Sequence, residues 1–179
     1  MGMTSDIIVF RCGHREVRDY RVTSHCALVA RAFGAKKIIV CGAKDPSIEK
    51  SVNSVTKRWG GPFKVAFTED WLGGLKKLKK QGYKLVHLTM YGSAIEEVDK
   101  EIGKLKKVCV IIGSQKVPKE VYQIADYNVG VTQQPHSEIA ALSVFLDRIQ
   151  QGNELSKKFR GAERRISPVK KGKIVIALK

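Results

Sequence analysis

The sequence predicts an α/β fold with a mostly parallel sheet and helices on both of its faces. Short apolar, β-branched runs alternate with longer segments of helical period, and this alternation implies right-handed crossovers between parallel strands. Two of the runs, Ile38–Val40 and Val108–Ile112, are continuously apolar, as expected of strands that are covered on both sides. The chain has 179 residues, of which 43% are hydrophobic. That length is enough for one domain with its own core.

The predicted strands are short runs rich in β-branched side chains, namely Ile7–Arg11, Lys37–Cys41, Lys64–Phe67, Leu85–Thr89, Val108–Ile112 and Tyr127–Val131. The segments of helical period are Thr23–Phe33, Ser47–Trp59, Trp71–Gln81, Ala94–Leu105, Lys119–Ile124 and Ser137–Gln150. The last helix is the clearest, because Ser137 can cap it and apolar residues recur from Ile139 to Ile149 at helical spacing.

The composition changes after Gly152. The tail is basic, and Arg165–Ser167 and Ile174–Leu178 flank a turn-like Val169–Gly172. Two short β-prone runs around such a turn predict a hairpin. We therefore expect an α/β domain over residues 1–152 and a basic extension with a β-hairpin over residues 153–179.

The charge balance is strongly basic. The 33 Lys and Arg residues exceed the 17 Asp and Glu residues, which gives a formal net charge of +16. Such a balance favours a polyanionic partner. No basic-then-apolar leader pattern opens the chain, and no apolar run approaches the roughly 18 residues of a membrane span. We therefore expect a cytoplasmic protein without a membrane partner.

The four cysteines form no CxxC pair, which argues against a disulfide framework and suggests a reducing environment. Cys12 and His14, followed by His25 and Cys26, could in principle hold zinc. Isolated thiols and imidazoles are more often core or site residues, and we expect no metal.

Three loops follow predicted strands at the edge where open α/β sheets bind ligands. They are Gly113–Pro118, Thr132–Glu138 and Met90–Ser93. A glycine at a strand end allows a ligand close to the backbone, although an ordinary turn explains Gly113 equally well. The loops match neither GxGxxG nor a P-loop, and no GxSxG elbow is present, so we set these classes aside.

An arginine-rich stretch, Arg11–Arg21, follows the first predicted strand at the same edge. The planar fork of arginine suits bidentate phosphate contacts, which dominate nucleic-acid affinity. We predict that Arg15 and Arg18 bind RNA phosphates. The alternative is a solvated loop in which arginines pair with Glu16 and Asp19.

Several motifs carry a resemblance to a known family. Gly13-His14-Arg15-x-x-Arg18-Asp19-x-Arg21-Val22-Thr23-x-His25 and Ala30–Ala35 resemble the opening of archaeal tRNA cytidine 2′-O-methyltransferases. The resemblance continues in order along nearly the whole chain, through Lys57–Phe63, His87–Gly92, Lys116–Tyr122, Ala125–Val129 and Gln134–Leu142.

This resemblance implies a SPOUT-type α/β fold with a deep C-terminal trefoil knot, and a homodimer. It implies transfer of a methyl group from S-adenosylmethionine to the ribose of the T-loop cytidine at tRNA position 56. The family's donor-binding loops correspond here to Leu88, Gly113, Ser114, Gln115, Lys116, Val117, Val131, Thr132, Gln133, Gln134, Pro135, His136, Ser137 and Glu138.

The catalytic residues are the least fixed part of the resemblance. Related ribose methyltransferases carry an Asn and an Arg early in the first motif, where this chain reads Arg21-Val22-Thr23-Ser24-His25. We predict that Arg21 contacts the ribose hydroxyl, with His25 as the alternative base. Three other interpretations stay open: a non-catalytic RNA-binding α/β protein, an enzyme that uses another adenine-containing ligand in the same loops, and an RNA methyltransferase with a different target nucleotide.

Overall fold

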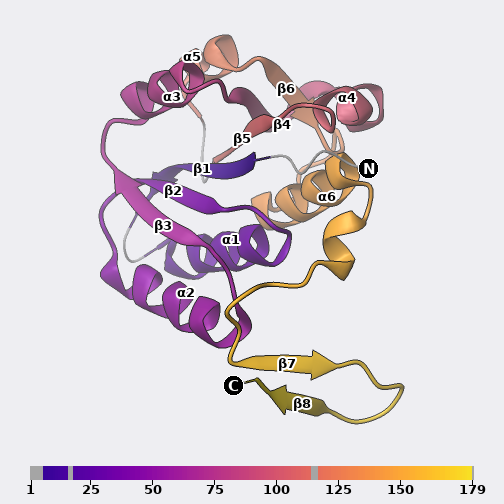
Figure 1. Cartoon of the computed structure of the whole chain (residues 1–179). Helices are drawn as coiled ribbons and strands as arrows, with labels where there is room; N and C mark the ends of the chain where they lie inside the picture. The colour runs from indigo at the N-terminus through magenta and orange to yellow at the C-terminus, as the bar shows by residue number, and fades with distance from the viewer. Residues whose placement is uncertain (1–5, 16–17, 114–116, 179) are drawn as a thin grey trace.

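The computed structural model describes residues 6–15, 18–113 and 117–178. A six-stranded sheet with the order β3-β2-β1-β5-β4-β6 forms the centre of the molecule, and all its strand pairs are parallel (Figure 1). The predicted α/β class is thereby confirmed. The strands are β1 (Asp6–His14), β2 (Lys37–Gly42), β3 (Lys64–Thr68), β4 (Lys84–Ala94), β5 (Lys107–Gly113) and β6 (Tyr127–Gly130).

Helices cover both faces of the sheet, as expected. One face carries α1 (Tyr20–Ala32), α2 (Pro46–Trp59), α4 (Ile95–Ile102) and α6 (Glu138–Gln150), and the other carries α3 (Trp71–Lys80) and α5 (Lys119–Ile124). The side chains of β1 alternate between the two cores: Ile7 and Val9 face α1 and α6, whereas Ile8 and Phe10 face α3 and α5. The apolar strands of the sequence are therefore buried on both sides.

Helix α6 begins where the sequence predicts. The side chain of Ser137 accepts a hydrogen bond of 3.1 Å from the backbone N–H of Ile139, which caps the helix. Leu142, Phe145 and Leu146 are fully buried against the sheet. The loop that ends at Ser137 is therefore attached to a firmly packed helix.

Three differences from the predicted elements concern the candidate site. Strand β1 continues to His14 through a register shift, so the arginine-rich stretch starts inside the sheet. Helix α1 begins at Tyr20, so Arg21 lies in its first turn and does not precede it. The Met90–Ser93 segment belongs to β4 and is not a loop. In β1 and β4 a bulge carries the strand past the point where the apolar pattern stops.

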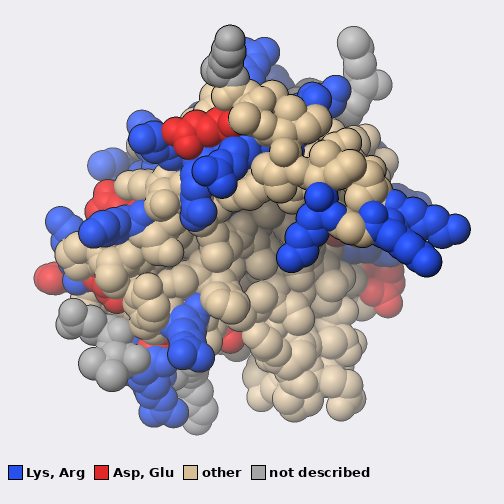
Figure 2. All heavy atoms as spheres, turned by 90° about the horizontal axis from the view of Figure 1, so that it is seen from below, with Lys and Arg blue, Asp and Glu red and all other residues tan. Residues whose placement is uncertain are grey.

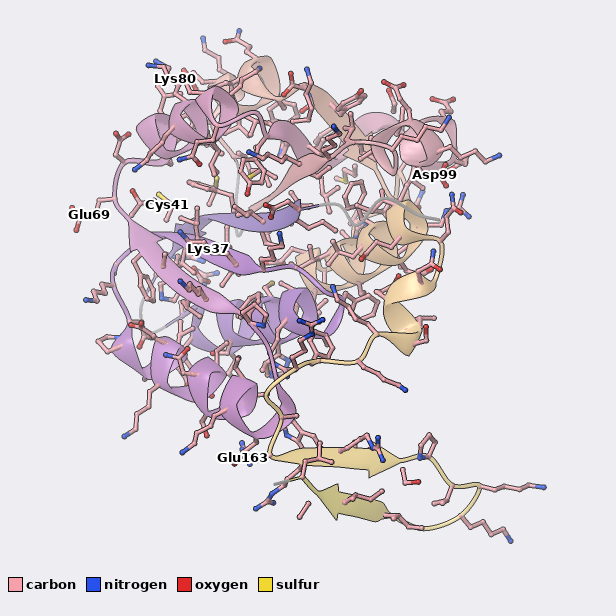
Figure 3. All side chains as sticks on the ribbon, in the orientation of Figure 1. Lys37, Cys41, Glu69, Lys80, Asp99 and Glu163 are labelled. Atoms are coloured by element: carbon pink, nitrogen blue, oxygen red, sulfur yellow. The ribbon has the colours of Figure 1, made fainter. Side chains whose placement is uncertain are left out.

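The C-terminal segment forms a short 3₁₀ helix (Asn153–Ser156) and then the predicted antiparallel hairpin of β7 (Arg164–Ser167) and β8 (Ile174–Ala177). The hairpin lies apart from the main sheet, beside α2 (Figure 1). Its base is held by Glu163, whose backbone N–H donates to the Arg58 carbonyl at 3.1 Å and whose carboxylate lies 3.7 Å from Lys57 (Figure 3). The division into a domain and an extension at residue 152 stays a prediction, as does the trefoil knot.

No helix within the described ranges is long and apolar enough to cross a membrane.

Candidate functional site

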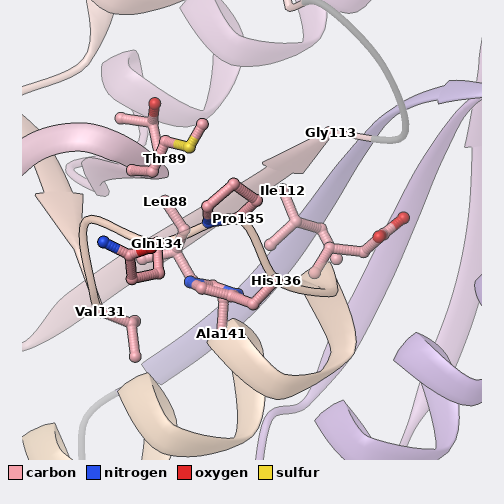
Figure 4. A pocket seen from close by; sticks show the side chains of 11 residues that line it. Leu88, Thr89, Ile112, Gly113, Val131, Gln134, Pro135, His136 and Ala141 are labelled. Carbon is pink, nitrogen blue, oxygen red and sulfur yellow. The ribbon is translucent and has the colours of Figure 1, made fainter.

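Two adjoining cavities of about 300 and 460 Å³ open at the carboxyl ends of β4 and β5. They share Leu88, Thr89 and Gly113. The first is also lined by Met90, Ile112, Val131, Gln134, Pro135, His136, Glu138 and Ala141 (Figure 4), and the second by His87, Tyr91, Val117, Lys119 and Tyr122. This is the edge where parallel sheets bind ligands.

Close packing between β4 and β6 shapes the wall of the first cavity. The register of this pair shifts between Leu88 and Ser93. A Cβ at Gly92 would lie 2.4 Å from the backbone of Asn128, so only glycine fits there. The extra length of β4 therefore bends close to β6 without a side chain between the two backbones.

The first cavity combines apolar walls with one acidic group. Leu88, Ile112, Val131 and Ala141 surround it (Figure 4), and Glu138 is the acidic residue among its described lining residues. The carboxylate Oε1 of Glu138 lies 3.2 Å from Nη2 of Arg11. Such a pocket suits a ligand that has a flat apolar part and a positively charged part.

A hydrogen-bonded network that the sequence reasoning missed supports the second cavity. Nδ1 of buried His87 lies 2.9 Å from Oδ1 of Asn128, and its ring meets the Tyr122 ring edge-on at 4.6 Å. The Tyr122 hydroxyl lies 3.0 Å from Oγ1 of Thr89. Burial lowers the pKa of His87, with the Asn128 hydrogen bond acting in the opposite direction, so the imidazole is neutral at pH 7. The sequence feature that could have indicated this network is the presence of His87 and Thr89 in the otherwise apolar predicted strand Leu85–Thr89.

The structure brings most of the predicted donor-binding residues together. Those that line the first cavity are Leu88, Gly113, Val131, Gln134, Pro135, His136 and Glu138, and Val117 lines the second. Thr132, Gln133 and Ser137 lie in the same loop but are not among the lining residues, and Ser137 instead caps α6. Ser114, Gln115 and Lys116 lie outside the described residues.

Arg21 and His25 are exposed and lie one turn apart on α1. Neither is among the described residues that line the two cavities. Residues at positions i and i+4 share one face of a helix. The two candidate catalytic side chains therefore form a pair on the surface, outside the cavities of their own chain.

The arginine-rich stretch divides into different environments. Arg11 is fully buried in β1, and His14 is buried with its Nδ1 2.9 Å from Oγ1 of Thr23. Arg15 pairs with Asp19, as the alternative interpretation expected, while Arg18 is exposed. Arg11 therefore belongs to the sheet, in agreement with the predicted strand Ile7–Arg11, and the RNA contacts of Arg15 and Arg18 stay a prediction.

The buried cysteines carry no nucleophilic chemistry at neutral pH. Burial raises the pKa of the Cys12 and Cys26 thiols to about 12, so both stay protonated. Within the part of the chain that the structure describes, no cluster of three His, Cys, Asp or Glu side chains could hold a metal ion.

Positively charged side chains are exposed on one face of the molecule. Lys and Arg side chains are spread over the face seen in Figure 2, with few Asp or Glu among them. This distribution matches the formal net charge of +16 and suits a polyanion that touches the protein at many points.

Comparisons with known proteins agree with these features. Residues 59–176 match the family described as tRNA ribose 2′-O-methyltransferase, aTrm56. The chain is 48% identical to a tRNA (cytidine(56)-2′-O)-methyltransferase of Thermococcus kodakarensis, over 98% of this chain and 99% of that one. It is 50% identical to the enzyme of the same name from Pyrococcus horikoshii, over 95% and 84%.

Among solved structures, the A. aeolicus TrmH/SpoU tRNA modifying enzyme superimposes with a TM-score of 0.63 at 19% identity, covering 86% of this chain and 78% of that one. That likeness supports the fold expected of SPOUT proteins. The family match and the near full-length relatives confirm the family that the motifs indicated: the chain belongs to the aTrm56 family of tRNA ribose 2′-O-methyltransferases.

Proposed function

We propose that this protein methylates the ribose 2′-hydroxyl of cytidine 56 in the T-loop of tRNA, with S-adenosylmethionine as the methyl donor. The observation that carries the proposal is the first cavity. The chain belongs to this family, and the first cavity is lined by residues of the loops that the resemblance identified as donor-binding.

The residues of the first cavity fit the donor. The apolar side chains of Leu88, Ile112 and Val131 suit an adenine ring, and Gly113 leaves room at the end of β5. Glu138 offers a negative charge to a cationic ligand. The bound donor supplies an activated methyl group, so the protein has to align it with a hydroxyl and does not need a metal.

Methyl transfer forms a bond from the methyl carbon to the ribose oxygen, breaks the bond from that carbon to sulfur, and releases the hydroxyl proton. We assign Arg21 to hold the hydroxyl and the adjacent phosphate. An arginine stays protonated at neutral pH, so its role is to orient and to balance charge. His25, one turn along α1, is the candidate proton acceptor.

The proposal includes a homodimer. Arg21 and His25 lie outside the cavities of their own chain. For these residues to act on a ligand in the cavities, helix α1 of a second copy of the chain would have to lie beside them. Exposed apolar side chains on the packed helices α1 and α6, Tyr20 and Val144, support such an interface. Light scattering of the purified protein gives the oligomeric state.

RNA contacts are assigned to Arg15, Arg18 and the basic tail. The side chain of Arg15 is 37% exposed even while paired with Asp19, and Arg18 is exposed. The hairpin and its turn carry further lysines and arginines on the surface. Because tRNA is found in the cytoplasm, we propose that the protein acts there.

The test is methylation of an unmodified tRNA transcript with isotope-labelled S-adenosylmethionine, followed by mass spectrometry of nuclease fragments. We expect one methyl group on the ribose of C56, and none on a matched tRNA with 2′-deoxycytidine at position 56. Methylation at another nucleotide would contradict the target. Binding of tRNA without binding of S-adenosylmethionine would favour a non-catalytic RNA-binding protein. Binding of another adenine nucleotide in place of S-adenosylmethionine would favour an enzyme that uses that other ligand.

A further inference from the structure

A fully buried arginine lies directly behind the first cavity. Arg11 is the largest side chain with no solvent exposure, and it pairs with Ile112 in the centre of the sheet. Its Nη2 donates to Oε1 of Glu138 at 3.2 Å. Its Nε and Nη1 find no oxygen or nitrogen acceptor among the described residues, and the thiol of Cys26 is the neighbour that contacts the guanidinium. A thiol is only a weak acceptor.

Stability alone does not account for this residue. Arg11 occupies the same face of β1 as Ile7 and Val9, where the neighbouring side chains are apolar. Burying a guanidinium with a single strong acceptor is costly, and apolar residues of similar volume often replace buried ion pairs without loss of stability. The charge therefore points to a role in the adjoining cavity.

The partner of Arg11 lines the first cavity. Glu138 is the first residue of α6, its side chain is 24% exposed, and it is the acidic residue among the described lining of the first cavity. Arg11 holds one carboxylate oxygen, Oε1. The ion pair thus joins a buried cation to an acidic residue of the cavity wall.

The overall charge of the protein makes this acidic residue important. A protein with a net charge of +16 repels a cation at long range, and S-adenosylmethionine, which has a sulfonium, an amino group and a carboxylate, carries a net positive charge. The other residues that line the cavity are mostly apolar, so a carboxylate among them needs a cation that compensates its charge. Arg11 supplies that cation, since its Nη2 lies 3.2 Å from Oε1 of Glu138.

We propose that Arg11 is a positioning residue: it holds the carboxylate of Glu138 in the cavity wall, where that carboxylate contacts the positive charge of the bound methyl donor. This inference rests on the proposed function, because it assumes that the first cavity binds S-adenosylmethionine. The titratable groups that face Glu138 are Arg11 from β1, Cys26 from α1 and His136 from its own loop. Cys26 stays neutral at physiological pH because burial raises its pKa to about 12.

The test replaces Arg11 by Met, which preserves most of the volume and removes the charge. Without Arg11, the Glu138 carboxylate loses the cation that holds it. We expect Arg11→Met to bind S-adenosylmethionine about tenfold or more weakly than the wild type. Arg11→Lys should restore most of this affinity.

Two controls separate the proposed role from a structural one. Glu138→Gln and the double variant Arg11→Met/Glu138→Gln should bind S-adenosylmethionine equally weakly, because Arg11 acts through Glu138. S-adenosylhomocysteine lacks the sulfonium charge but keeps the amino group. A loss in Arg11→Met that is confined to S-adenosylmethionine assigns Glu138 to the sulfonium, and the same loss for both ligands assigns it to the amino group.

Unchanged affinity in a folded Arg11→Met protein would overturn the inference. So would a further loss of affinity when Arg11→Met is added to Glu138→Gln, because it would indicate that Arg11 supports the fold and does not act through Glu138. Binding to the wild-type protein distinguishes a failure of this inference from a failure of the proposed function. If the wild-type protein does not bind S-adenosylmethionine, the proposed function itself is wrong.

Discussion

Arg15 holds Asp19 at both carboxylate oxygens. Its Nε lies 2.9 Å from Oδ2, its Nη2 lies 2.9 Å from Oδ1, and its backbone N–H donates to Oδ2 at 3.0 Å. The carbonyl of Asp19 accepts from the backbone N–H of Thr23 at 2.8 Å, inside α1. This pair therefore fixes where α1 begins, and with it the position of Arg21 in the first turn.

Replacing Asp19 by Asn should lower stability in a pH-dependent way. The hydrogen bonds from Arg15 lower the pKa of the buried Asp19 carboxyl to about 2, against about 3.9 in an unfolded chain. A group with a lowered folded-state pKa stabilises the fold above its unfolded pKa, and this stabilisation is lost as the pH falls from about 4 toward 2. We expect a loss of about 1 kcal/mol at pH 7, since the exposed Arg15 is partly screened.

Urea unfolding of the wild type and Asp19→Asn at pH 7 and at pH 3 measures this loss. Glu69→Gln, which removes an exposed carboxylate, is the matched control and should change stability little at either pH. A difference between wild type and Asp19→Asn that stays constant down to pH 3 would contradict the ion-pair explanation.

Gly113→Val should abolish binding of S-adenosylmethionine and leave tRNA affinity nearly intact. Gly113 ends β5 and lines both cavities, so a branched side chain there would fill the space that they share. Calorimetry with the donor and filter binding with tRNA separate the two effects. Ala141→Ser, a small change elsewhere in the lining of the first cavity, is the control. Normal donor affinity in a folded Gly113→Val protein would exclude Gly113 from the donor site.

Binding of tRNA should depend strongly on salt. If Arg15, Arg18 and the tail neutralise phosphates, log affinity should fall with log salt by about 0.7–0.9 for each phosphate contacted. Arg18→Ala should reduce that slope by about one contact, since its side chain is exposed. A slope near zero in a salt titration of the wild type would eliminate phosphate contacts as the main source of affinity.

The tail should depend on Phe159 for its attachment. The guanidinium of buried Arg31 lies 5.2 Å from the centre of the Phe159 ring and also donates to the Gly60 carbonyl. Phe159→Ala removes this contact, and we expect faster trypsin cleavage around Lys157–Arg160 with unchanged donor binding. Val169→Ala, an exposed change in the hairpin, should leave the cleavage rate unchanged. Equal rates in both variants would show that other contacts hold the tail.

The sequence predicted the fold well because periodicity carries most of that information. Continuous apolar runs such as Val108–Ile112 can only be buried on both faces, and Ser137 marks the start of α6. Strand ends were harder, because the bulges in β1 and β4 arise from contacts with neighbouring strands. The pairing of Arg11 with Glu138 links residues 127 positions apart, so no local pattern indicates it.

Arg21→Ala tests the catalytic assignment. Arg21 is exposed on α1, one turn before His25, and its position matches the first catalytic motif of the resemblance. If Arg21 orients the hydroxyl and balances charge in the transition state, its removal should lower kcat about 100-fold or more. Donor affinity should barely change, and tRNA affinity should fall less than tenfold. Arg21→Lys should rescue poorly, because a point charge cannot reproduce the planar fork of arginine.

Single-turnover methylation of unmodified tRNA, with enzyme and donor saturating, separates the chemical step from binding. Arg18→Ala is the matched control: it removes another exposed arginine, so it should weaken tRNA binding while the saturated rate stays close to that of the wild type. A wild-type single-turnover rate in Arg21→Ala would move catalysis elsewhere. His25→Ala would then be the next variant, because His25 shares the exposed face of α1 and its imidazole can accept the proton that the reaction releases.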